Sequence, residues 1–166
     1  MSDPTPEGGE LIVTRVVDAP RELVFRCMIE PEHLAQFWGP VGTSTPLETI
    51  TVDPRPGGVF ETVMVNDTDG SRYPVRATYL EVVEPERLVW AEAGTGMTTT
   101  STFHELGPSR TEIRIHQTNV PDALRTPEAR AGFLTSLDRL TTYLSRLSDH
   151  LGQHPGSRIV TDEGPA

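Results

Sequence analysis

The histidines and the single cysteine carry the most versatile chemistry in this chain. The five histidines are spread widely, at His33, His104, His116, His150 and His154. We expect His104 and His116 on the same face of one hairpin, yet about four residues apart, which is about 13 Å at the rise of a strand. A metal ion holds nitrogen ligands at about 2 Å. We therefore predict no metal site.

Cys27 falls beside Leu23, Val24 and Met28 on one face of an expected helix. A catalytic thiolate needs exposure and a neighbouring base, so we interpret Cys27 as an inert core residue. No serine stands in a GxSxG elbow, the strand-to-helix turn that presents a nucleophile. From these patterns we predict no catalytic residue and no cofactor.

Acidic residues are plentiful, and two of them, Glu61 and Glu81, fall within expected strands. A carboxylate buried on the inner side of a sheet would favour proton-transfer chemistry. A carboxylate on the solvated side would have no such role. The strand around Glu61 has apolar residues on both of its faces, so alternation leaves the two interpretations open there.

The segment DPRPGG at 53–58 contains a glycine pair of the kind that can cradle a phosphate. A phosphate-binding loop follows a strand and opens a helix, whereas the residues after this segment, VFETVMV, favour a strand. We interpret the segment as a structural turn in which Gly57 or Gly58 supplies the positive φ.

A set of large apolar residues remains. They could line a space between a sheet and a helix, or they could form an ordinary core. An apolar pocket with a few polar groups is the usual form of a small-molecule site. The candidate cavity-lining residues are Phe37, Trp38, Phe60, Met64, Tyr79, Trp90, Phe103, Phe133 and Leu137.

The helix that would cover this space is predicted over 121–147. Its apolar stripe has spacings of four, three, four and three residues and falls within about 80° of arc. The stripe consists of Phe133, Leu137, Leu140, Leu144 and Leu147. We expect the first half of the stripe to face the cavity and the second half to pack in the core.

The preceding part of the chain reads mostly as short strands. We predict a strand at 11–17, two short helices up to 38, and strands at 47–52, 58–65, 73–83, 87–91, 97–106 and 111–118. Short turns between consecutive strands indicate an antiparallel sheet. In the last hairpin, Ile113 and Ile115 alternate with polar residues, so pairing Phe103 with Ile113 puts all three on the core face. The prediction is an α+β helix-grip fold, a curved antiparallel sheet wrapped around the long helix.

The 166 residues suit one domain. The formal net charge is −10, and all 14 basic residues are arginine. This balance disfavours nucleic acid and anionic membranes as partners. No apolar stretch reaches the length of a membrane span, the first residues do not resemble a signal peptide, and one cysteine fits a reducing compartment. We expect a cytoplasmic protein.

Five segments in this order resemble the family named for the activator of the heat-shock protein 90 ATPase, in the START-like SRPBCC superfamily. They are RVVDAPRELVF, PEHLAQFWGP, DPRPGGVF, YLEVVEPERLVW and GFLTSLDRLTTYL. The resemblance covers residues 11–147, so we predict a START-like domain there, a disordered N-terminus at 1–10 and a flexible tail at 148–166. Phe133 stands where relatives often carry tryptophan.

The resemblance implies a protein that binds a hydrophobic small molecule, such as a lipid or a polyketide-like compound, in a cavity between the sheet and the C-terminal helix. The same superfamily includes cyclase or aromatase-type enzymes and co-chaperone regulators of a heat-shock protein ATPase, and these are the alternatives. The eukaryotic activator has a separate N-terminal chaperone-binding domain, for which this sequence has no room. The family also leaves a homodimer open.

Overall fold

The computed structural model describes residues 9–153. The elements follow in the order β1 (Glu10–Val17), α1 (Arg21–Ile29), α2 (Pro31–Phe37), β2 (Thr43–Ser44), η1 (Leu47–Thr49), β3 (Thr51–Val52), β4 (Val59–Asn66), β5 (Arg72–Val83), β6 (Arg87–Glu92), β7 (Thr98–Gly107), β8 (Arg110–Thr118), η2 (Asp122–Leu124) and α3 (Pro127–Gln153). The predicted helix-grip fold is confirmed. The outer parts of the predicted disordered N-terminus and flexible tail, 1–8 and 154–166, lie outside the described residues.

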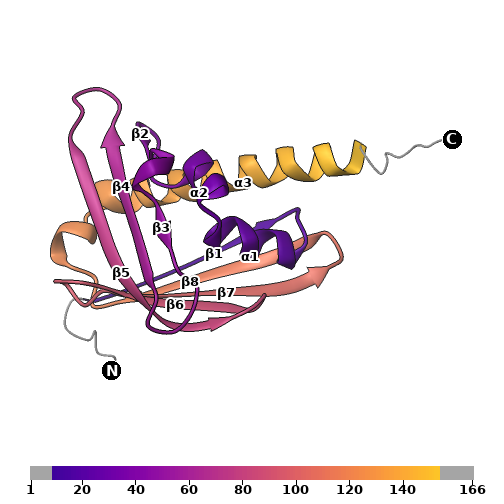
Figure 1. Cartoon of the computed structure of the whole chain (residues 1–166), viewed down its shortest axis with the longest axis horizontal. Coiled ribbons are helices and arrows are strands. Elements are labelled where there is room, and N and C mark those ends of the chain that lie inside the picture. The colour runs from indigo at the N-terminus through magenta and orange to yellow at the C-terminus, as the bar shows by residue number, and fades with distance from the viewer. Residues whose placement is uncertain (1–8, 154–166) are drawn as a thin grey trace, which may run out of the picture.

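One antiparallel sheet contains all the strands, in the order β1-β8-β7-β6-β5-β4-β2, with β3 also paired to β4. Its curvature brings the helices to one side (Figure 1). The β7–β8 register pairs Phe103 with Ile113 and His104 with Glu112, as the alternation of residues predicted. Phe103, Ile113 and Ile115 are buried on the inner face.

α3 runs across the inner face of the sheet, and α1 and α2 lie on the same side (Figure 1). Leu137, Leu140 and Leu144 of the α3 stripe are buried, and Phe133 and Leu147 are half-buried against the same core. The middle of α3 is therefore its most buried part, and Tyr143 also packs against Phe37 of α2, with ring centroids 5.8 Å apart.

Two predicted boundaries were wrong. α3 begins at Pro127 instead of 121, because the chain first forms the short turn η2 and the Thr126 hydroxyl then accepts a hydrogen bond from the Ala129 amide. This is the usual side-chain cap at a helix N-terminus. α3 also continues past Leu147 to Gln153.

The predicted strand at 47–52 was also wrong in part. Only Thr51–Val52 is a strand, and η1 replaces its first half. Pro46 sets the turn, since its carbonyl accepts hydrogen bonds from both the amide and the hydroxyl of Thr49. A side chain that bonds to its own nearby backbone competes with a strand ladder.

The guanidinium of Arg139 on α3 fastens the helix to the loop after α2. Its Nη1 donates to the carbonyl oxygens of Gly39 (2.8 Å) and Thr43 (3.2 Å), with Pro40 and Trp38 slightly farther away. On the opposite side of α3, Arg15 of β1 bonds Asp138 at 2.9 Å. These contacts fix the position of α3 along the sheet.

The DPRPGG segment forms the predicted turn between β3 and β4. Gly57 has φ +86°, in the left-handed region that favours glycine. Gly58 is required for space, because a Cβ built there would lie 2.0 Å from the Asp53 carbonyl oxygen. Among the described residues, no helix is long and apolar enough to cross a membrane.

We predict that Gly58→Ala destabilises the protein far more than Gly57→Ala. The methyl group at 58 meets backbone atoms, whereas the space around Gly57 is open and only its positive φ is strained, at about 1–2 kcal/mol. Urea unfolding of both variants measures the difference. Equal losses of stability would contradict the close approach at Gly58.

Replacing Arg139 with methionine should lower the free energy of unfolding by about 1–3 kcal/mol, the usual worth of hydrogen bonds from a charged donor. Arg146→Met is the matched control, since Arg146 is an exposed arginine two turns later on the same helix. Urea unfolding should show little change for the control. A loss of the same size in both variants would mean that the carbonyl contacts of Arg139 contribute nothing.

Candidate functional site

Four aromatic rings meet on the inner face of the sheet and form the candidate site. Trp38, Phe60, Tyr79 and Trp90 make up this group, which we call the aromatic cluster. The ring centroids of Phe60 and Trp90 lie 5.2 Å apart, as do those of Trp38 and Phe60. Tyr79 lies 6.0 Å from Phe60 and 6.3 Å from Trp90. These separations are typical of favourable aromatic pairs.

Strand register explains why three of the rings converge. Tyr79 on β5 pairs directly with Trp90 on β6, and Phe60 on β4 pairs with Ala77, two residues from Tyr79. Side chains two residues apart on a strand share a face. The three rings therefore point to the same side from three neighbouring strands.

Trp38 reaches the cluster from the other side. It is the C-cap residue directly after α2, and Gly39 then turns the chain with φ +97°. A Cβ built at Gly39 would lie 3.0 Å from the sulfur of Met64, so the loop passes close over β4. Arg139 holds this loop through its carbonyls, and Trp38 thus connects the sheet, the loop and α3.

The remaining candidates divide into two groups. Phe133 and Leu137 lie on the first half of α3 and pack on the core. Phe37 and Phe103 do not join the cluster: Phe37 packs against Tyr143, and Phe103 lies 5.8 Å from the ring of Phe25 on α1. We therefore build the site on the cluster, Met64, Phe133 and Leu137.

Burial is uneven across this site. Phe60, Tyr79 and Trp90 are buried, whereas Trp38, Met64 and Phe133 are half-buried. The half-buried side chains come from the α2 loop, β4 and α3. We call these three half-buried side chains the rim, because they are the more exposed members of the site.

Three buried hydroxyls on the sheet have no hydrogen-bond partner among the described residues: those of Thr62, Tyr79 and Ser101. Thr62 lies on β4 and Ser101 on β7, so one small ligand would not reach all three. The Tyr79 hydroxyl is the one that belongs to the cluster. Burial, with a smaller contribution from the Asp53 carboxylate, raises the pKa of Tyr79, so its phenol stays protonated.

Glu92 is an inner-face acid that we did not single out from the sequence. It ends β6 and pairs with buried Ala77, which pairs in turn with Phe60. It is half-buried, and burial raises the pKa of its carboxyl group. The signal that could have found it is alternation, because Glu92 stands two residues after Trp90.

The two strand acids chosen from the sequence lie elsewhere. Glu61 alternates with buried Phe60 and Thr62 and therefore faces outward, where its carboxylate lies 3.5 Å from Nε of Arg76. Glu81 is exposed and bonds Arg87. Both carboxylates form ion pairs with arginines on the outside of the sheet, so we assign neither of them to the candidate site.

The contacts of Cys27, His33 and His116 are of the kind that stabilise a fold. Cys27 is fully buried, and burial raises its pKa to about 12, so it is a neutral thiol at physiological pH. His33 Nδ1 lies 2.6 Å from the Tyr143 hydroxyl, and His116 lies 2.9 Å from the Glu10 carboxylate.

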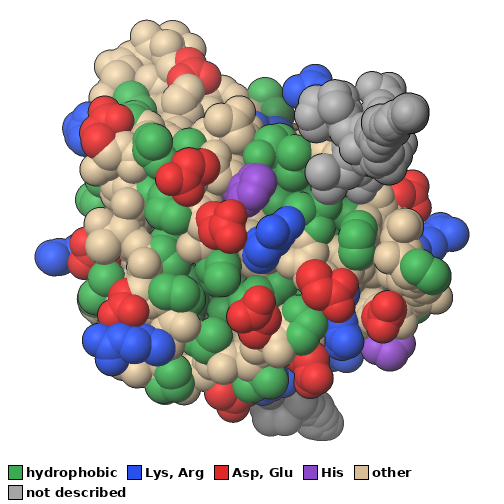
Figure 2. Space-filling view, turned by 45° about the vertical axis from the view of Figure 1, so that its right-hand side comes forward, with side chains coloured by type: hydrophobic (Ala, Val, Ile, Leu, Met, Phe, Trp, Pro, Cys, Tyr) green, Lys and Arg blue, Asp and Glu red, His purple; other side chains and the backbone are tan. Residues whose placement is uncertain are grey.

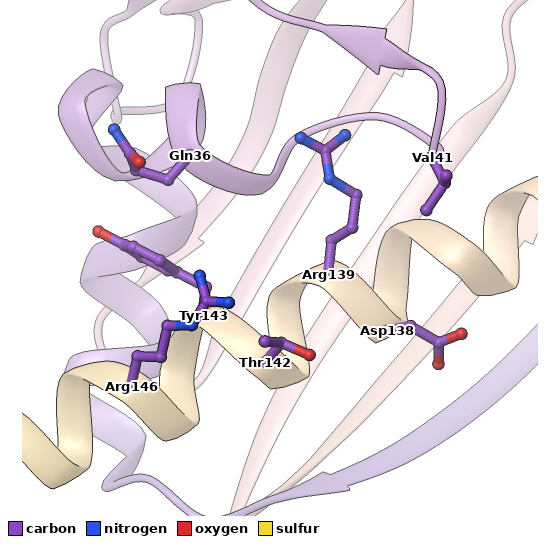
Figure 3. Close-up of a pocket in the computed structure, with 7 residues that line it drawn as sticks. All are labelled: Gln36, Val41, Asp138, Arg139, Thr142, Tyr143 and Arg146. Atoms are coloured by element: carbon purple, nitrogen blue, oxygen red, sulfur yellow. The ribbon is translucent and has the colours of Figure 1, made fainter.

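Two open hollows in the described surface contain none of the candidate residues. The larger, about 340 Å³, lies between α2 and α3 and is lined by Gln36, Val41, Asp138, Arg139, Thr142, Tyr143 and Arg146 (Figure 3). In this hollow, Arg139 bonds the loop after α2 and the Tyr143 hydroxyl bonds His33. Both side chains therefore hold α3 in place. The second hollow, about 280 Å³, lies beside Leu11 and Val120.

The charges on the face shown in Figure 2 do not form a patch of one sign that would indicate a charged partner. On the face shown in Figure 2, acidic and basic side chains are interspersed with apolar ones. With a net charge of −10, the average potential around the chain is negative.

We predict that Glu92→Gln is more stable than the wild type at pH 7 and that this advantage shrinks on acidification. A raised pKa means that the native state binds the proton more tightly than the unfolded chain. The contribution of Glu92 to stability therefore falls as pH rises from its ordinary value of about 4.3 through the raised value. Because glutamine does not ionise, the variant does not lose this stability as the pH rises.

Urea unfolding at pH 7 and at about pH 4 measures the effect. Glu112→Gln, the same chemical change on the outer face of β8, corrects for the loss of one negative charge. If the two variants gain the same stability at pH 7, burial of Glu92 is not the cause.

The comparisons with solved structures agree with this architecture. Protein CV1439 from Chromobacterium violaceum is 27% identical, with a TM-score of 0.75 over 82% of this chain and 97% of that one. Protein NE0264 from Nitrosomonas europaea is also 27% identical, with a TM-score of 0.71 over 84% and 96% of the two chains.

An AHSA1 protein from Silicibacter pomeroyi, 22% identical, shares the fold with a TM-score of 0.69 over 82% of this chain and 98% of its own. No curated protein matches the chain. The family model described as activator of Hsp90 ATPase homolog 1-like protein matches residues 18–145. The chain therefore belongs to the AHSA1-like family, within the START-like SRPBCC superfamily.

Proposed function

We propose that this protein binds a hydrophobic small molecule, of the lipid or polyketide-like class, against the aromatic cluster beneath the first half of α3. The observation that carries the proposal is the uneven burial of the site. Three of its rings are buried, whereas the apolar side chains of the rim, which come from three different segments of the chain, are only half-buried. An ordinary core would more simply bury all of these side chains.

The cluster supplies both parts of a small-molecule site. Its rings offer large, rigid apolar surfaces, and each aromatic pair with a ligand ring adds about 0.5–1.5 kcal/mol beyond area burial. The unpartnered hydroxyl of Tyr79 offers one polar contact within an otherwise apolar wall. Such a combination fixes the orientation of a ligand whose affinity comes mainly from apolar contact.

Entry requires movement of the rim. Neither surface hollow is lined by a residue of the cluster, so we expect a ligand to reach Phe60 and Trp90 by displacing Trp38 or Phe133. Exchange of half-buried side chains between rotamers is fast compared with opening of a whole domain. The Arg139 contacts limit how far the loop carrying Trp38 can move.

Fluorescence tests the proposal directly, because the chain has only two tryptophans and both belong to the cluster. Titration with N-phenyl-1-naphthylamine, a neutral apolar fluorophore, should be saturable, with rising probe emission and quenching of tryptophan emission. Phe133→Asp should weaken binding at least about tenfold, because it removes an apolar wall and adds a charge.

Leu147→Asp is the matched control, since Leu147 is half-buried on the same stripe of α3, four turns away from Phe133. It should bind the probe as the wild type does. Equal weakening in the two variants, or no saturable binding by the wild type, would contradict a site at the cluster.

A further inference from the structure

Glu92 places an uncompensated negative charge beside the aromatic cluster. It follows Trp90 by two residues on β6, a separation of about 7 Å along the strand, and lies in the same cross-strand row as Phe60. None of the hydrogen bonds or ion pairs of the described residues involves its carboxylate, and burial alone raises the pKa of Glu92. Neither the α2 loop nor α3 brings a counter-charge to it.

Two basic groups on the inner side of the sheet already have partners. Arg15 of β1 faces α3, where it bonds the Asp138 carboxylate and the Thr141 hydroxyl. Arg139 donates to the carbonyl oxygens of the α2 loop. The inner face therefore offers a ligand an acceptor at Glu92 and no free cation of its own at these positions.

We propose that Glu92 makes this site select apolar molecules that are neutral or carry a hydrogen-bond donor, and that it rejects apolar anions such as fatty acids. This inference rests on the proposed function and specifies its ligand. An ionised carboxylate only accepts hydrogen bonds. A ligand hydroxyl, amide N–H or amine can therefore satisfy it on entry.

An anionic ligand meets the opposite situation. Its own charge loses water when it enters, and the carboxylate of Glu92 repels it across a medium of low dielectric constant, where like charges interact far more strongly than in water. The burial that raises the pKa of Glu92 shows that this position already disfavours negative charge. We expect discrimination of at least about tenfold.

A matched pair of probes tests the inference. N-phenyl-1-naphthylamine and 8-anilinonaphthalene-1-sulfonate share one ring system, and only the second carries a sulfonate. Dissociation constants for both are measured at pH 7 on the full chain, by tryptophan quenching, for the wild type, Glu92→Gln and Glu112→Gln. Glutamine keeps an acceptor oxygen and the shape of the side chain, so the variant should fold.

The decisive quantity is the ratio of the two dissociation constants, because the probes also differ in hydrophobicity. The dissociation constant of the sulfonate probe divided by that of the neutral probe should fall about tenfold in Glu92→Gln. It should stay unchanged in Glu112→Gln, whose charge lies on the outer face of the sheet. Displacement of the neutral probe by decanol but not by decanoate, with decanoate becoming effective in Glu92→Gln, would support the same conclusion.

Three results would overturn it. An unchanged ratio in Glu92→Gln, or an equal change in both variants, would mean that Glu92 has no local role. Displacement by decanoate as effective as that by decanol in the wild type would contradict rejection of anions. These results leave binding at the cluster intact, whereas failure of the neutral probe to bind would remove the proposed function as well.

Discussion

The packing of α3 across the inner face of the sheet is the contact on which the rest of the structure depends. A sheet with one apolar face has to bury it, and the leucine stripe of α3 supplies the cover. The stripe is not used uniformly. Leu140 and Leu144 are buried in the core, whereas Phe133, nearer the start of the helix, is half-buried against the same core. The same helix therefore contributes buried side chains to the fold near its middle and a half-buried candidate residue near its start.

Polar contacts fix the position of α3 along the sheet. An apolar stripe alone would tolerate sliding, since burial is non-directional. Arg139 and Arg15 add directional bonds on opposite sides of the helix. Because Arg139 bonds the loop that carries Trp38, the position of the helix and the rim of the site are linked. The contact that fixes the helix therefore also holds the segment that carries Trp38.

Much of this could be predicted from the sequence, because periodicity records which face a residue occupies. Alternation gave the pairing of Phe103 with Ile113, and the spacing of leucines gave α3. The start of α3 and the turn at η1 depended on local bonds from Thr126 and Thr49, which compete with regular structure and leave a weaker pattern. Trp38 and Trp90 belonged to one candidate set, but their direct ring contact depends on tertiary structure and has no local signal in the sequence. Glu92 did have one, its position two residues after Trp90.

Nuclear magnetic resonance of the two indole N–H groups tests the central claim most directly, because Trp38 and Trp90 are the only tryptophans and both belong to the cluster. With saturating N-phenyl-1-naphthylamine, both indole signals should shift. The amide signals of Arg114 and His116, whose side chains lie on the outer face of β8, should stay in place. Shifts confined to the hollow at Gln36 and Arg146, with both indole signals unchanged, would contradict a site beneath the first half of α3.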